Sequence, residues 1–213
     1  MDRLIEETVV REDPAAAKAV RESDAAGLPE IQVSAAQGKF LHLTTLVRGA
    51  KRALEIGTLG GYSAIWVARA LPADGQLITL ELEPDHAEVA RRNIQAAGLS
   101  ERVEVRVGAA QDLLPVLAEE MAEPFDLVFI DADKAGLPTY FSWALRLSRR
   151  GTVIICDNVV RAGAVLDADS ADPDVLGVRE LLEQLRGEGR VSATVVQTVG
   201  VKGYDGFLFA VVN

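Results

Sequence analysis

The feature that most constrains the fold of this chain is a regular alternation of short β-rich runs with longer amphipathic segments, which begins at Arg52. The runs are apolar and several are rich in β-branched residues, as expected of strands that are buried on both faces. Such alternation predicts an α/β fold, with a parallel sheet, right-handed crossovers and helices on both faces. The predicted strands are residues 53–56, 77–82, 103–107, 125–131 and 152–156.

The C-terminal part of the chain breaks this alternation. A helix predicted at about residues 173–185 is followed by two further strands, at residues 191–199 and 206–212. The polar turn between them is too short to hold a crossover helix, so the two strands should form an antiparallel hairpin. A parallel sheet finished by an antiparallel strand differs from the usual dinucleotide-binding arrangement.

The first 50 residues are predicted to form a helical extension. Asp13 and Pro14 are typical of an N-cap followed by proline at the first helical position. Ser34 and Gln37 form a capping box that opens a second helix. Because no repeat or long linker interrupts the chain, we expect a single domain over residues 1–213, with the Rossmann-like core in residues 51–213.

The charge and the cysteine content exclude several classes of function. Acidic residues outnumber basic ones by 32 to 22, and a formal charge of −10 argues against a nucleic-acid partner. The longest apolar runs are strand-sized and the N-terminus lacks a secretory signal, so we expect a cytoplasmic protein with no membrane partner. With one cysteine, Cys156, and two histidines, any metal must be held mainly by oxygen.

A glycine-rich segment at residues 54–63 joins the first strand to the first full helix of the core. Glycines at such a turn let the backbone approach a ligand, and the following helix start offers free N–H groups. A tight turn without a ligand explains the glycines equally well. Two later strand ends favour a ligand: Glu81 stands where ribose hydroxyls are held, and the small residues 108–112 leave room for an adenine ring.

The cofactor suggested by these strand ends contains adenosine, and the position of Glu55 bears on its charge. Glu55 precedes the glycines, where a carboxylate would crowd a pyrophosphate but suits a cofactor with ammonium and sulfonium groups. An NAD(P)-dependent oxidoreductase would use similar parts and remains an alternative. A non-catalytic protein that retains the cofactor pocket is a third hypothesis.

The fourth and fifth predicted strands end in polar residues that suit a metal site. Asp131 follows the fourth strand, and Asp157 and Asn158 follow the fifth. We expect both strands to neighbour the first, so that these side chains meet beside the glycine loop. Their oxygens suit Mg²⁺, Mn²⁺ or Ca²⁺, although Asp157 and Asn158 could simply cap a turn. Lys134 is a candidate general base; alternatively, it is an exposed lysine that pairs with Asp133.

Taken together, residues 54–63, Glu81, Ala110, residues 131–134, Asp157 and Asn158 resemble the cation-dependent O-methyltransferases of the caffeoyl-CoA and catechol type, bacterial branch. The similarity runs from about residue 31 to the C-terminal hairpin. It implies the Rossmann-like seven-stranded methyltransferase sheet, mostly parallel with an antiparallel last strand, and S-adenosyl-L-methionine as cofactor. It also implies a cofactor site lined by Val33, Glu55, Gly57, Thr58, Ser63, Glu81, Ala110 and Asp131. Finally, it implies a divalent metal, most simply Mg²⁺, on Asp131, Asp157 and Asn158, with Lys134 and Asp131 as catalytic residues.

The resemblance also indicates a homodimer, with the N-terminal helices as candidates for its interface, and a small-molecule hydroxyl acceptor. Three positions depart from the family's patterns. Asp133 stands where catechol enzymes have tryptophan, Asp205 and Gly206 where they have a glutamate, and Ala162 where plant coenzyme A-ester enzymes have asparagine. These departures argue against a pocket specific for catechol itself or for caffeoyl-CoA. We still expect a phenolic acceptor with adjacent hydroxyls, since two neighbouring oxygens can chelate one metal.

Overall fold

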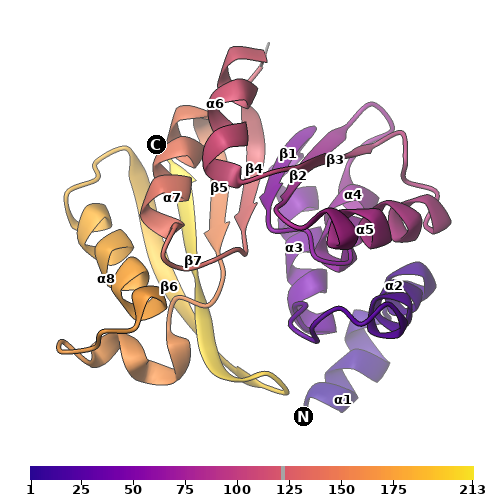
Figure 1. Ribbon diagram of the computed structural model, residues 1–213, viewed down its shortest axis with the longest axis horizontal. Helices are drawn as coiled ribbons and strands as arrows, with labels where there is room; N and C mark the ends of the chain where they lie inside the picture. Colours follow the sequence, from indigo (N-terminus) through magenta and orange to yellow (C-terminus); the bar gives the residue numbers. More distant parts are fainter. Residues whose placement is uncertain (121–122) are drawn as a thin grey trace.

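The computed structural model describes residues 1–120 and 123–213, and its strands form one mixed sheet (Figure 1). The strands are β1 (Arg52–Ile56), β2 (Gln76–Glu81), β3 (Val103–Val107), β4 (Phe125–Ile130), β5 (Ser148–Cys156), β6 (Val191–Gly200) and β7 (Gly203–Val212). Within the described residues the sheet has seven strands, in the order β3-β2-β1-β4-β5-β7-β6. The neighbours among β1 to β5 pair in parallel, whereas β7 is antiparallel to both β5 and β6. The predicted sheet and its antiparallel last strand are confirmed.

Two details of the predicted sheet are wrong. β4 separates β5 from β1, so the fifth strand does not neighbour the first. β5 also begins at Ser148 rather than at residue 152, because a register shift between Phe125 and Leu127 lets Ser148 pair with Phe125. Bulges of this kind depend on the partner strand, and the local sequence does not signal them.

Helices cover both faces of the sheet, as the alternation predicted (Figure 1). Asp13 and Ser34 cap the two N-terminal helices as expected: Asp13 accepts from the Ala15 N–H at 2.7 Å and Ser34 from the Gln37 N–H at 3.2 Å. The helices are α1 (Asp2–Ile5), the π-helix η1 (Glu6–Val10), α2 (Pro14–Ala25), α3 (Ala35–Arg48), α4 (Tyr62–Ala70), α5 (Pro84–Ala96), α6 (Ala110–Glu120), α7 (Leu137–Arg146), the short helix η2 (Arg161–Leu166) and α8 (Pro173–Arg186).

Side chains that alternate along the strands build two cores, one on each face of the sheet. In β4, Leu127 and Phe129 pack into the core shared with α3, α4 and α5. Val128 and Ile130 face the opposite core, shared with α6, α7 and α8. The central strands are therefore buried on both sides, and the carboxyl ends of the parallel strands are left as the natural place for a ligand.

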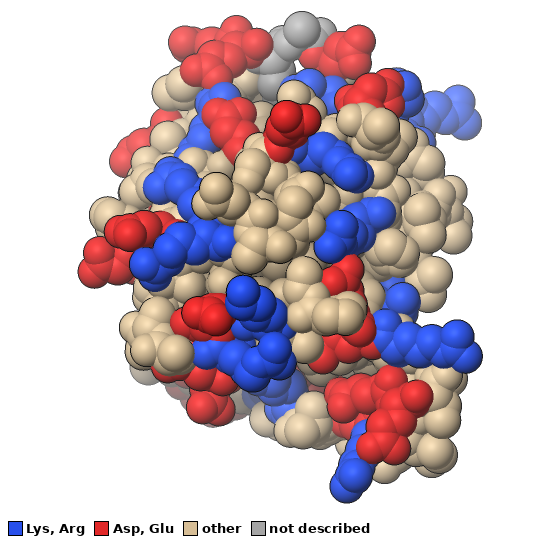
Figure 2. All heavy atoms as spheres, turned by 90° about the vertical axis from the view of Figure 1, so that its right-hand side faces the viewer, with Lys and Arg blue, Asp and Glu red and all other residues tan. Residues whose placement is uncertain are grey.

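The surface carries both signs of charge. Figure 2 shows acidic and basic side chains interspersed over the face on which α2 and α5 lie, rather than a continuous basic field. A duplex-binding surface would gather its lysines and arginines in one stripe. Among the described residues, no helix combines the length and the apolar character that crossing a membrane requires.

Candidate active site

A pocket of about 790 Å³ opens at the carboxyl ends of the parallel strands. Its walls come from the loop after β1, the ends of β2, β3 and β4, and the N-terminal segment between α2 and α3. Most of the predicted site residues line it, namely Val33, Gly57, Thr58, Ser63, Glu81, Ala110, Asp131, Lys134 and Asn158. Glu55 and Asp157 are buried behind this wall.

The glycines of the loop after β1 are required by contacts within the protein. Gly57 has a φ of +97°, and a Cβ built on it would stand 2.0 Å from the carbonyl oxygen of Asp131. A Cβ on Gly60 would stand 1.9 Å from the Ser23 hydroxyl of α2. The glycines therefore let the loop pack against the residue that follows β4 on one side and against the N-terminal extension on the other. Gly57 and Gly60 also line the pocket, so the prediction that this loop admits a ligand stays a prediction.

Glu81 at the end of β2 organises the same loop. Its Oε2 accepts hydrogen bonds from the Thr58 N–H at 3.1 Å and the Leu59 N–H at 2.7 Å, and its Oε1 accepts from the Glu83 N–H at 3.0 Å. His86, which the sequence did not single out, lies 3.7 Å from the same carboxylate. Glu81 thus lines the pocket at the position predicted for a ribose-binding carboxylate, with its orientation fixed by backbone donors.

Glu55 in β1 is fully buried beneath this loop, with 0% of its surface exposed. The Thr79 hydroxyl donates to its Oε2 at 2.6 Å, whereas its Oε1 has no hydrogen-bond partner among the described residues. Burial raises the pKa of Glu55 to about 7, and hydrogen bonding by the Ser63 and Thr79 side chains partly offsets this rise. An unpartnered buried oxygen next to the pocket fits a cofactor that carries cationic groups.

The raised pKa of Glu55 predicts a pH-dependent stability for the cofactor-free protein. The folded state holds this proton more tightly than the unfolded state, so its stabilisation is complete below about pH 4.5 and is lost as the pH rises to about 7. Glu55→Gln should remove this term, which is on the order of 3 kcal/mol. Urea unfolding at pH 5 and pH 8 checks this. If the variant and the wild type lost the same unfolding free energy between pH 5 and pH 8, the role assigned to Glu55 would be contradicted.

Lys134 is buried, with 4% of its surface exposed, and it lines the pocket. Its Nζ donates to Asp131 Oδ1 at 3.0 Å and to the Ala132 carbonyl at 2.8 Å. Asp133 is not its partner, because the Asp133 carboxylate accepts from the Tyr140 hydroxyl at 2.6 Å and the Gly136 N–H at 2.7 Å. The alternative of an exposed lysine paired with Asp133 is therefore wrong.

Asp157 and Asn158 follow β5 beside these groups. Burial raises the pKa of Asp157, and the nearby negative charge of Asp131 raises it further; hydrogen bonding by Gln37 partly offsets both. Asn158 adopts a left-handed conformation, with a φ of +55°, and its amide donates to Asp205 Oδ2 at 3.2 Å. Asp205 thereby fixes the turn in which Asn158 projects into the pocket.

The donor chemistry of this corner fits a hard cation. Asp131, Asp157 and Asn158 supply carboxylate and amide oxygens, which suit Mg²⁺ or Ca²⁺, and the mutual repulsion of the two carboxylates would be relieved by a positive charge. Among the described residues, no group of three or more His, Cys, Asp or Glu side chains is placed to hold a metal. The predicted set therefore relies on the asparagine as its third protein ligand.

Several pocket residues were not anticipated from the sequence. Tyr140 of α7 and Asp174 of α8 line the wall beyond Lys134, together with Arg161 of η2, which begins the loop expected to shape the acceptor pocket. Val20 and Ser23 of α2 approach from the N-terminal side. These residues are distant in sequence from the strand ends, and only the tertiary packing brings them to the pocket.

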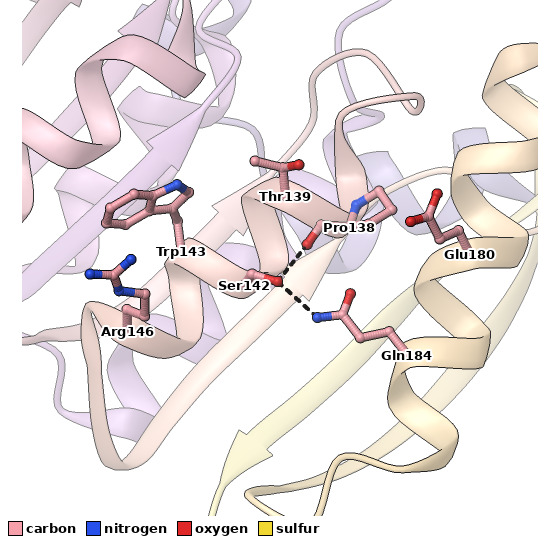
Figure 3. Close-up of a pocket in the computed structure, with 7 residues that line it drawn as sticks. All are labelled: Pro138, Thr139, Ser142, Trp143, Arg146, Glu180 and Gln184. Carbon is pink, nitrogen blue, oxygen red and sulfur yellow. Dashed lines mark hydrogen bonds between the residues drawn. The ribbon is translucent and has the colours of Figure 1, made fainter.

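A second hollow, of about 420 Å³, lies between α7 and α8 and contains none of the predicted site residues (Figure 3). In it, Gln184 of α8 donates to the Ser142 hydroxyl of α7 at 2.8 Å. The Arg146 guanidinium lies 4.1 Å from the ring centroid of Trp143. Because the predicted site residues gather at the strand ends and not in this hollow, the pocket at the strand ends is the candidate site.

The strand order, the antiparallel last strand and the pocket at the carboxyl ends of the parallel strands define a Rossmann-like methyltransferase fold. Residues 6–208 match the model of the O-methyltransferase family, and the chain belongs to that family. It is an O-methyltransferase, and the comparisons do not favour the two alternatives, an NAD(P)-dependent oxidoreductase and a non-catalytic cofactor-binding protein.

Similar proteins span the whole chain. It is 52% identical over 213 residues to a catechol O-methyltransferase of Niastella koreensis, covering 100% of this chain and 96% of that protein. It is 53% identical over 213 residues to a catechol O-methyltransferase of Mycobacterium tuberculosis, covering 100% and 95%. The crystal structure of the O-methyltransferase from Bacillus cereus in complex with SAH gives a TM-score of 0.97 at 52% identity, covering 100% and 96%.

Proposed function

We propose that this enzyme transfers a methyl group from S-adenosyl-L-methionine to a phenol with adjacent hydroxyls, and that it requires a divalent cation. The observation that carries the proposal is the convergence of Asp131, Lys134 and Asn158 on one pocket wall beside the glycine loop, with Asp157 directly behind them. The names of the catechol O-methyltransferase relatives and the SAH complex of the Bacillus cereus enzyme support it.

The walls of the pocket suit a sulfonium nucleoside. Glu81 would accept hydrogen bonds from ribose hydroxyls, and Ala110 leaves space for a flat base. The buried carboxylate of Glu55 and the pocket-lining carboxylate of Asp131 would favour the cationic amino-acid end of the cofactor. When bound, the cofactor supplies a methyl group whose carbon–sulfur bond breaks as the new oxygen–carbon bond forms.

Asp131, Asp157 and Asn158 would hold the divalent cation, which when bound would lower the pKa of an acceptor hydroxyl. Lys134 Nζ now donates to Asp131 and to the Ala132 carbonyl as an ammonium; it would release a proton to solvent first, and the neutral amine would then take up the hydroxyl proton. Asp205 would keep Asn158 in place by its hydrogen bond to the amide. Much of the rate enhancement would come from holding the two reactants in attack geometry.

Calorimetry and product analysis test the proposed cofactor and acceptor. The protein should bind S-adenosylmethionine and not NAD⁺, and with Mg²⁺ it should convert ethylcatechol to a monomethyl ether that mass spectrometry detects. Binding of NAD⁺ without S-adenosylmethionine would overturn the cofactor assignment. Cofactor binding without any ether from a panel of vicinal diphenols would overturn the acceptor class.

We also propose that the protein is a homodimer and that α3 contributes to its interface. The outer surface of α3 exposes Leu43 and Leu46, each 51% exposed, and Val47, which is 90% exposed. Apolar side chains gathered on one helix face are typical of a contact surface. Light scattering should give twice the mass of the chain, and a monomeric mass at micromolar concentration would contradict the proposal.

A further inference from the structure

The pocket carries more negative than positive side chains. Five carboxylates line it, and its lysine and arginine side chains are Lys134 and Arg161. Acidic walls of this kind raise the local concentration of cationic ligands and lower that of anionic ones. The carboxylates are Glu81, Glu83, Asp131, Asp133 and Asp174.

Three of these carboxylates have partners within the protein that stabilise their negative charge. Asp131 pairs with Lys134 at 3.0 Å, and Asp174 pairs with Arg161 at 3.0 Å. Glu81 is held by backbone N–H groups at the cofactor end, where Glu83 also lies, immediately after β2.

Asp133 resembles Glu83 in having no ion-pair partner among the described residues, but it adjoins Lys134 in the chain, whereas Glu83 follows β2. It is exposed, and both of its oxygens accept hydrogen bonds from neutral donors, the Tyr140 hydroxyl and the Gly136 N–H. Among the described residues no lysine, arginine or histidine forms an ion pair with it. Asp133 therefore fixes a negative charge, without an ion-pair partner in the part of the chain described, in the same pocket as Lys134, the proposed base, to which it is adjacent in the chain.

We propose that Asp133 selects acceptors by charge, favouring vicinal diphenols with an ammonium-bearing substituent over those with a carboxylate. The inference rests on the proposed function and names a narrower class of acceptor for it. An exposed ion pair changes an affinity by up to about fivefold. Because attraction of the amine and repulsion of the carboxylate act in opposite directions, the preference between the two classes should reach about tenfold.

Arg161 is the group that could reverse this preference by binding an anionic acceptor. Its guanidinium is engaged by Asp174, and its backbone N–H donates to Asp205 at 2.9 Å. An acceptor carboxylate would have to displace Asp174 from the guanidinium. The same carboxylate would also enter a pocket lined by five carboxylates, so the balance of charge favours the cationic acceptor.

Three acceptors with the same diphenol ring and different charges test the proposal: dopamine, ethylcatechol and dihydrocaffeic acid. For the wild type, kcat/KM should fall in that order, with dopamine about tenfold above dihydrocaffeic acid. Asp133→Asn keeps the size of the side chain and should bring that ratio close to unity. Tyr140→Phe removes the hydroxyl donor but keeps the charge, so it should retain the preference.

Asp169→Asn is the matched control, since it removes an exposed aspartate charge from a loop outside the pocket lining. Its selectivity ratio should equal that of the wild type. A wild-type ratio of kcat/KM for dopamine to dihydrocaffeic acid near unity would overturn the proposal, and so would a ratio that Asp133→Asn leaves unchanged. In either case, turnover of ethylcatechol would leave the proposed function standing. Absence of turnover with all three acceptors would instead count against the proposed function.

Discussion

Replacing Asp157 with asparagine is expected to lower the rate of methyl transfer by about a thousandfold, because a divalent cation contributes several kcal/mol to such reactions. Asparagine keeps the size of the side chain and one oxygen donor, but it removes a negative charge that the proposed cation requires. Cofactor binding should persist, since Asp157 lies behind the pocket wall and Glu81 and the glycine loop are untouched. Initial rates with ethylcatechol and calorimetry with S-adenosylmethionine measure the two effects separately.

The same substitution should not destabilise the cofactor-free protein. Burial raises the pKa of Asp157, so the ionised carboxylate disfavours the folded state above that pKa, and its removal should leave the unfolding free energy equal or higher at pH 8. Asp169→Asn, the same change at an exposed position, is the control and should retain wild-type activity. Wild-type rates in Asp157→Asn would show that the buried carboxylate has no part in the reaction.

Gly57→Ala is expected to destabilise the protein by about 3 kcal/mol or more and to abolish cofactor binding. The new Cβ would stand 2.0 Å from the Asp131 carbonyl oxygen, and a φ of +97° is strained for any residue with a side chain. Neither group can yield easily, because the Asp131 N–H donates to the Ile56 carbonyl at 2.8 Å and the Gly57 N–H to the Leu80 carbonyl at 2.9 Å. The strand that carries Asp131 would have to move.

Gly98→Ala separates the two contributions to that loss. Gly98 also has a positive φ, of +70°, but nothing lies within 4 Å of a Cβ built on it. It should therefore lose only the conformational term, about 1 kcal/mol. Urea unfolding of both variants gives the difference between their losses of unfolding free energy. Equal losses would contradict the close contact between Gly57 and the Asp131 carbonyl oxygen.

The sheet could be predicted because its strands are buried on both faces, which leaves continuous apolar runs such as residues 127–130 in the sequence. The hairpin followed from the shortness of its turn. The early start of β5 could not be predicted, since it depends on pairing between Ser148 and Phe125 across a register shift. Long-range pairing leaves no local signal in either strand.

The site was predictable to the extent that parallel strands bring their carboxyl ends together. That rule placed Glu81, Asp131 and Asn158 at one pocket, where the structure has them. The partner of Lys134 could not be decided from the sequence, because it depends on how the chain turns into α7. There the Gly136 N–H and the Tyr140 hydroxyl donate hydrogen bonds to the Asp133 carboxylate, which leaves Lys134 to pair with Asp131. The contributions of α2 and α8 likewise depend on how those helices pack.

Withdrawal and return of the cation is the most direct test of the proposed chemistry. The purified enzyme would be treated with EDTA, supplied with S-adenosylmethionine and ethylcatechol, and assayed for the methyl ether by mass spectrometry, with EDTA presaturated with Mg²⁺ as the control. We predict that chelation lowers the rate by about a hundredfold or more and that added Mg²⁺ restores it. Undiminished methyl transfer in the presence of free EDTA would contradict the role assigned to Asp131, Asp157 and Asn158.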